Sequence, residues 1–318
     1  MTRAVRKKEK TFSHYMGVDL GSTTAKTVIV DDTGRIVSSA VVQMGAVSRA
    51  GLARSMTSAL EAAALGEADV AATIATGYGR RLVPGVGRTF TEITCHARGV
   101  AAMCPGTRLV VDVGGQDSKA ILVDELGIVE NFAMNDRCAS GTGRFFEVLA
   151  RAIECDIGEL APLALTGDRD LEVSSMCATF AETEIISLLA RGETREDIAA
   201  SVHRAVAART LGLVAQVGKH APVVMTGGVA KNAAAVHFLE QALDVPVSVP
   251  SAPQITGAFG AALLAREGFR GQQTEADHQI GTNRAAPPPN CATCEATAAR
   301  PGTGPGSDGR PLIPVRLR

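Results

Sequence analysis

Two copies of one strand–turn–strand pattern constrain the fold of this chain more than any other feature. In each copy an apolar segment ends in an aspartate, Asp19 or Asp112, and a glycine-bearing turn leads into a returning strand and then a third. Helical segments follow both meanders, so we expect two similar domains that face a cleft. Two unrelated hairpins are the alternative, because glycine turns are common. The strands expected in the two meanders span residues 15–20, 24–30, 35–43, 108–113, 118–124 and 128–134.

The rest of the sequence alternates helical periodicity with short apolar runs. Near residue 271 proline and glycine become frequent, which is typical of a low-complexity tail that buries too little apolar surface to order. The expected helices span 49–64, 142–155, 178–191, 196–218, 231–243 and 254–266, and the further strands 70–76, 223–225 and 245–249. The expected boundaries are 1–14 for a flexible basic extension, 15–104 for subdomain I with a closing helix at about 254–268, 105–253 for subdomain II, and 271–318 for the tail.

Both aspartate turns carry groups that can hold a polyphosphate such as ATP or ADP. Glycine permits a tight turn, backbone N–H groups and hydroxyls can donate to phosphate oxygens, and Lys26 adds positive charge. Asp19 and Asp112 can bind Mg²⁺ directly or through water. Gln116 and Asp112 are the candidate catalytic residues, Gln116 by orienting the attacking water or, alternatively, only by stabilising its turn. The candidate phosphate ligands are Gly21, Ser22, Thr23, Thr24, Ala25, Lys26, Gly114 and Gly115.

A third glycine turn lets an adenosine approach the backbone, at Gly227 and Gly228 with Lys231 close behind. The three turns in this order resemble the superfamily of actin, sugar kinases and heat-shock chaperone ATPases. The fold class that this resemblance implies is α/β, with two similar βββαβαβα domains around a nucleotide cleft. No Walker-type G-x-x-x-x-G-K-[ST] motif occurs in the sequence, in agreement with that superfamily. In it the segment at Gln254 returns to the nucleotide cleft.

The amino-acid composition narrows the classes of binding partner and the cellular compartment that we expect for this protein. Aromatic residues make up 3% of the chain and the net charge is −1, so neither a stacking platform nor a basic surface for nucleic acid is expected. No apolar run approaches the roughly 20 residues that span a bilayer, so no membrane contact is expected. Seven scattered cysteines do not resemble a secreted disulfide framework. We therefore expect a cytoplasmic protein whose thiols stay reduced.

Cys138 and Cys177 each lie where a short segment with glycine or serine is expected to open an amphipathic helix. A helix start carries free N–H groups and a partial positive charge, which stabilise thiolates and any anionic cluster that they hold. Two cysteines are too few for a 4Fe–4S cluster, which takes four, but two chains about a two-fold axis would supply four. The alternative is two buried structural thiols.

Four segments carry a narrower resemblance: residues 134–146 and 176–184, Thr76-Gly77-Tyr78-Gly79-Arg80 and Cys95-His96-Ala97. They resemble the ATP-dependent activators of 2-hydroxyacyl-CoA dehydratases and the related ATPase subunits of benzoyl-CoA reductases. The resemblance covers roughly residues 15–268. It implies a homodimer or a pseudo-symmetric heterodimer of similar subunits, with one 4Fe–4S cluster per dimer on Cys138 and Cys177 of both. It also implies electrons from ferredoxin or flavodoxin and an iron–sulfur partner that acts on a CoA thioester.

Two other functions remain open, and several residues are expected to have a structural role alone. A small-molecule kinase would need a carboxylate base and no cluster, and a nucleotide sensor would need neither. Activator and benzoyl-CoA reductase subunit are nearly interchangeable on this sequence. His96 is expected to be structural, and no function is expected of Cys291 and Cys294. The cysteines expected to be core thiols are Cys95, Cys104 and Cys155.

Overall fold

The computed structural model describes residues 14–44, 47–173 and 178–283. Cys177, Cys291, Cys294 and the N-terminal extension therefore lie outside the described residues. Internal contacts separate a unit that ends at Thr274 from a second that begins at Glu275, and the first unit contains every strand described below. Among the described helices, none combines the length and apolar character needed to cross a membrane.

The first sheet is a three-stranded meander extended by parallel strands. Strand β1 pairs antiparallel with β2 and parallel with β4, and the order across the sheet is β3-β2-β1-β4-β5. Six of the seven β1 residues are buried, which agrees with a central strand covered on both faces. Its strands are β1 (His14–Leu20), β2 (Thr24–Asp31), β3 (Ile36–Gln43), β4 (Val70–Thr76) and β5 (Arg88–Thr89).

The second sheet repeats this topology. Its order is β10-β9-β6-β7-β8, so β6, β7, β8, β9 and β10 correspond to the five strands of the first sheet in chain order. The register repeats as well, because Asp19 is opposite Lys26 and Asp112 is opposite Lys119. The expected internal repeat is confirmed, and the two hairpins are related. The strands are β6 (Leu109–Val113), β7 (Ser118–Val123), β8 (Val129–Asn135), β9 (Val223–Thr226) and β10 (Val247–Ser248).

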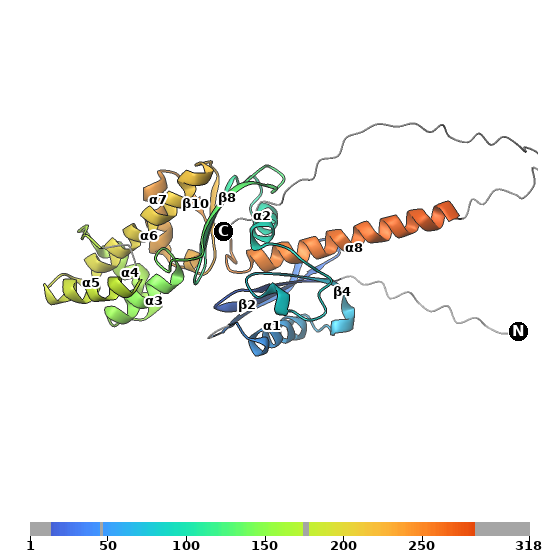
Figure 1. The fold of residues 1–318 in the computed structure, drawn as a ribbon, viewed down its shortest axis with the longest axis horizontal. Coiled ribbons are helices and arrows are strands. Elements are labelled where there is room, and N and C mark those ends of the chain that lie inside the picture. Colours follow the sequence, from blue (N-terminus) through green and yellow to red (C-terminus); the bar gives the residue numbers. More distant parts are fainter. Residues whose placement is uncertain (1–13, 45–46, 174–177, 284–318) are drawn as a thin grey trace, which may run out of the picture. The chain divides into compact units, whose positions relative to one another are not determined.

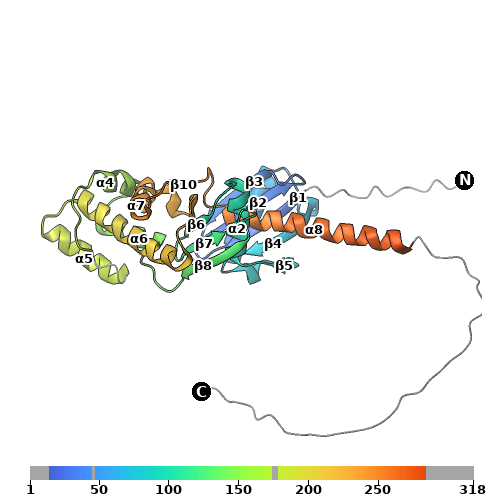
Figure 2. The ribbon, with the colours of Figure 1, turned by 90° about the horizontal axis from the view of Figure 1, so that it is seen from above.

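Helices cover both sheets, as Figure 1 shows for α1 and α8 on the two faces of the first. Helix α2 packs on the second sheet and crosses α8 closely, since a Cβ on Gly99 would meet the Thr256 carbonyl and one on Gly260 the Cys95 carbonyl (Figure 2). The α-helices are α1 (Arg49–Ala62), α2 (Glu92–Met103), α3 (Gly143–Ala152), α4 (Leu160–Thr166), α5 (Ala178–Ala190), α6 (Arg195–Val217), α7 (Ala233–Leu243) and α8 (Thr256–Asn283). Short 3₁₀ turns are η1 (Glu67–Asp69), η2 (Arg80–Leu82), η3 (Ile157–Glu159) and η4 (Val229–Lys231).

The expected end of the closing helix at residue 266 is wrong. Helix α8 continues to Asn283, past the expected start of the tail at 271. Two contacts explain part of the extension: the Phe269 ring packs against Tyr15 with centroids 5.8 Å apart, and Arg270 lies 3.7 Å from Asp32. At the other end, Gln254 precedes the helix instead of opening it.

Candidate nucleotide site and the adjoining cysteine loop

The first turn connects the ends of β1 and β2. The Gly21 N–H donates to the carbonyl of Thr24 at 3.1 Å, which closes the turn. Lys26 Nζ donates to Asp19 Oδ2 at 3.0 Å, so the cross-strand register brings a cation and a carboxylate together at the turn. Asp19 is buried, whereas the Lys26 side chain keeps 15% of its surface exposed. The lysine can therefore reach a phosphate at this turn.

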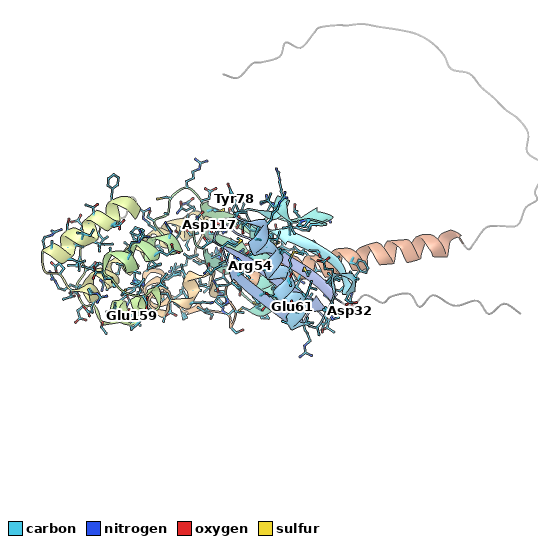
Figure 3. The ribbon with its side chains drawn as sticks, turned by 90° about the horizontal axis from the view of Figure 1, so that it is seen from below. Asp32, Arg54, Glu61, Tyr78, Asp117 and Glu159 are labelled. Atoms are coloured by element: carbon cyan, nitrogen blue, oxygen red, sulfur yellow. The ribbon has the colours of Figure 1, made fainter. Side chains whose placement is uncertain are left out.

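The second turn has the same register but a different charge environment. Thr226 Oγ1 donates to Asp112 Oδ1 at 2.7 Å. Lys119 Nζ lies 3.3 Å from Asp112, 2.7 Å from Asp117 and 3.2 Å from Glu92, which comes from α2 (Asp117 is labelled in Figure 3). Three carboxylates thus surround one ammonium group.

The two turns differ in the surroundings of their lysines, Lys26 and Lys119. Lys119 is 2% exposed and already satisfied by carboxylates, whereas Lys26 contacts one carboxylate. Lys119 therefore ties the turn to α2, and Lys26 is the lysine available to a ligand.

The pKa of the Asp112 carboxyl reflects this environment. Burial alone would raise the pKa, but the neighbouring His96 and Lys119, with the hydrogen bond from Thr226, lower it far below its usual range. Burial alone would likewise lower the pKa of Lys119, and the three carboxylates around it raise that pKa instead. Asp112 is therefore a charged carboxylate in the floor of the site, as a cation ligand must be.

His96 lies between the two aspartates. Its Nδ1 is 3.0 Å from Thr256 Oγ1 and 3.5 Å from Asp112 Oδ1. A Cβ placed on Gly257 would lie 3.1 Å from His96 Nε2 and 3.4 Å from Asp19 Oδ2, so the missing side chain leaves room for the two groups. The expected structural role agrees with its burial. Its contact with Thr256 was missed, because Thr256 begins α8, 160 residues away in the sequence.

The first and second aspartate turns, here also called the phosphate turns because they carry the candidate phosphate ligands, approach each other directly. A Cβ on Gly115 would lie 2.6 Å from Thr23 Oγ1 and 3.2 Å from Thr23 Cβ. Gly115 therefore has to be glycine for the turns to come this close. Gln116 is exposed at the tip of the same turn, so its amide can reach a ligand, and its water-orienting role stays a prediction.

The third turn begins with Gly227, whose φ of +88° favours glycine. Its N–H donates to the carbonyl of Pro253 at 2.9 Å, and a Cβ on Gly228 would lie 3.3 Å from Gln254 Nε2. Gln254 and the diglycine turn, expected at one cleft, therefore lie side by side. Lys231 is exposed at the end of η4.

A buried histidine that sequence reasoning missed supports this turn. His203 of α6 lies 2.9 Å from Asn232 Nδ2 and 2.7 Å from the Ala199 carbonyl. Burial lowers its pKa to about 4, so the ring is neutral near pH 7. Its ring also packs on Phe146 of α3. The third turn and α3 are thus joined through one side chain.

The segment that contains Cys138 leads into helix α3, as expected, but Cys138 itself lies in the loop after β8, five positions before the first helical residue. Gly141 at φ +90° and the N-cap Thr142 separate it from α3. Hydrogen bonds within the loop hold Cys138: its N–H donates to Asn135 Oδ1, its carbonyl accepts from Asn135 Nδ2, and its sulfur lies 2.8 Å from Ser140 Oγ. Helix α5 begins at Ala178, directly after Cys177 in the sequence.

This loop connects to the second phosphate turn through α3. The N–H of Gly143 donates to the Gly114 carbonyl at 2.8 Å, and the N–H of Arg144 donates to the Gly115 carbonyl at 2.9 Å. The first turn of α3 is therefore fastened to the glycines of the nucleotide site. A shift of those glycines would move α3 and the loop before it.

Residues 16–265 match the BadF/BadG/BcrA/BcrD ATPase family. The chain belongs to this family. Its actin-like fold is shared at the level of architecture alone by a ROK family glucokinase from Streptomyces griseus, at 17% identity and a TM-score of 0.51 over 80% of this chain and 99% of that one.

Relatives of this ATPase include dehydratase activators. The activator of lactoyl-CoA dehydratase from Anaerotignum propionicum is 44% identical over 252 residues, which are 79% of this chain and 97% of the relative. The solved activator of the 2-hydroxyisocaproyl-CoA dehydratase from Clostridium difficile, with bound ADPNP, is 39% identical, with a TM-score of 0.78 over 82% of this chain and 97% of that one. A subunit of benzoyl-CoA reductase from Thauera aromatica is 36% identical over 211 residues, 64% of this chain and 74% of the relative.

Proposed function

We propose that this ATPase uses ATP hydrolysis to deliver single low-potential electrons to an iron–sulfur dehydratase that acts on 2-hydroxyacyl-CoA thioesters. The observation that carries the proposal is the backbone connection from the glycines of the second phosphate turn through α3 to the Cys138 loop. The activators among its relatives, at 44% and 39% identity, favour a dehydratase over a reductase as the partner. Benzoyl-CoA reductase, with a subunit at 36% identity, is the second candidate.

The nucleotide site supports the first half of this proposal. Lys26 and the backbone N–H groups of the two aspartate turns would hold the phosphates of ATP or ADP, and Asp19 and Asp112 would hold Mg²⁺. Gln116 would orient the attacking water. The diglycine turn, with Lys231 and Gln254, would receive the adenosine.

Cys138 fits a cluster ligand by its chemistry and its place. It is half-buried in a loop with a hydroxyl 2.8 Å from its sulfur, whereas Cys95 is fully buried and burial raises its pKa to about 12. A 4Fe–4S cluster would take up one electron and pass it on. Cys138 and Cys177 supply two thiolates per chain, so two chains would share one cluster.

Two exposed apolar side chains of α5 support the pairing of two chains. Phe180 is 71% exposed and Ile186 53% exposed. Large exposed apolar side chains favour a surface that another protein covers. Because α5 follows Cys177 directly, a second chain there would bring its own cysteines close. We therefore propose a homodimer, or a heterodimer with a similar subunit.

The source of electrons would be ferredoxin or flavodoxin, and the compartment the cytoplasm, where thiols remain reduced. A small-molecule kinase would bind nucleotide with the same fold but would need no cluster. Anaerobic purification separates the two: the proposed function gives a brown protein, and a kinase or a nucleotide sensor gives a colourless one.

Removal of either proposed ligand is expected to abolish the cluster. Cys138→Ser and Cys177→Ser should each lose essentially all iron and sulfide and all ATP-dependent electron delivery, because four thiolates are needed. Anaerobic iron and sulfide analysis measures this, with about two atoms of each per chain expected in the unmodified protein.

The matched control is Cys155→Ser, another half-buried cysteine of subdomain II. It should keep its iron. Full iron content in Cys138→Ser would overturn the assignment.

A further inference from the structure

The loop between β8 and α3 holds a hydroxyl against the sulfur of Cys138. Ser140 Oγ lies 2.8 Å from Cys138 Sγ, and Ser140 is completely buried. Asn135, the last residue of β8, fixes the backbone around this contact. Its Nδ2 donates to the Cys138 carbonyl at 2.9 Å, and its Oδ1 accepts from the Cys138 N–H at 3.2 Å. The contact therefore lies in a loop whose backbone is fixed by further hydrogen bonds.

The direction of this hydrogen bond follows from the state of the sulfur. A thiol and a hydroxyl can each donate, but a sulfur that ligates iron has lost its proton. In that state the Ser140 O–H is the donor and Cys138 Sγ the acceptor. Hydrogen bonds to charged groups are stronger than those to neutral groups.

We propose that Ser140 is a positioning residue that raises the reduction potential of the cluster held by Cys138, by donating a hydrogen bond from Oγ to Sγ. The inference rests on the proposed function and adds a residue that neither the family match nor the motif analysis singles out. Reduction adds one electron and one negative charge, and the proton stays on Ser140. Because the bond is stronger to the more negative state, it favours the reduced cluster. The electron donor then meets an acceptor that is easier to reduce.

The test uses the anaerobically purified dimer with Ser140→Ala. The midpoint potential, read from a redox titration followed by visible absorbance and electron paramagnetic resonance, is expected to fall. At a fixed applied potential the ratio of reduced to oxidised cluster should drop about tenfold, which corresponds to about 59 mV for one electron. Ser140→Thr keeps the hydroxyl and should return the potential toward that of the unmodified protein.

Thr142→Ala is the matched control. Thr142 is also completely buried, and its Oγ1 donates to the Ala139 carbonyl at 2.6 Å in the same loop. The ratio of reduced to oxidised cluster should change by less than about twofold. Thr142→Ala loosens the loop but leaves the Ser140 hydroxyl in place beside the sulfur. Equal shifts in the two alanine variants, an unchanged potential in Ser140→Ala, or loss of its iron would each overturn the role of Ser140. Full iron content in Cys138→Ser would instead defeat the proposed function.

Discussion

Asp112→Asn is expected to reduce the rate of ATP hydrolysis by about 100-fold, equivalent to about 2.7 kcal/mol of activation free energy. The amide keeps the shape and can still accept from Thr226, but it removes the negative charge proposed to hold Mg²⁺ at the floor of the site. Lys119 keeps two carboxylate partners, Asp117 and Glu92, so the fold should survive. Steady-state phosphate release at saturating Mg²⁺ and ATP measures the effect.

Glu92→Gln is the control for this prediction. Glu92 contacts the same lysine at 3.2 Å from α2, so the variant weakens the ion network without removing a carboxylate from the proposed Mg²⁺ site. Hydrolysis should stay within about threefold of that of the unmodified protein, on the order of 0.6 kcal/mol. If Glu92→Gln were as slow as Asp112→Asn, the Asp112 carboxylate would matter through Lys119 and not through a bound cation.

Gly115→Ala is expected to slow ATP hydrolysis by between about 10-fold and 100-fold. The reason is that overpacking a close contact costs about 1–3 kcal/mol of free energy. The new Cβ would lie 2.6 Å from Thr23 Oγ1 and would force the two phosphate turns apart. The same turn carries the carbonyl that accepts from Arg144, so the displacement should also reach α3. Rapid-quench measurement of bound ATP separates slow turnover from weak binding.

Two further variants make this prediction specific. Thr23→Ala removes the clashing Oγ1, so the double variant should hydrolyse ATP faster than Gly115→Ala alone, as a double-mutant cycle would reveal. Gly87→Ala adds a Cβ that meets nothing within 4 Å and should be silent. A Gly115→Ala protein with unchanged hydrolysis would show that the two turns need not approach this closely.

The repeated domain could be predicted because its signal is local. Each apolar strand has an aspartate as its next-to-last residue and a glycine directly after its end, and a lysine seven positions after the aspartate completes the same cross-strand pair, Asp19 with Lys26 and Asp112 with Lys119. The differences between the copies could not be predicted, because they come from tertiary contacts. Glu92 belongs to a helix outside the meander, and only the fold brings it to Lys119.

The Cys138 loop shows a different limit. Gly141 and Thr142 are the residue types of a turn and an N-cap, so the helix start at Gly143 was readable from the sequence. The hydrogen bond between Ser140 and Cys138 depends on loop dihedral angles that no periodicity encodes. The extension of α8 past 266 likewise depends on packing of Phe269 against Tyr15, across the whole chain.

In the proposed function, the nucleotide at the two turns changes the state of the cluster at Cys138. The most direct test is the reduction potential of the cluster in matched samples with ADP and with a non-hydrolysable ATP analogue, together with electron delivery to a dehydratase or reductase component. Nucleotide shifts such an equilibrium only as far as its affinities for the two states differ. We expect different potentials in the two samples, and electron delivery when ATP is present but not when ADP replaces it. Identical potentials, with electron delivery unaffected by ATP, would contradict it.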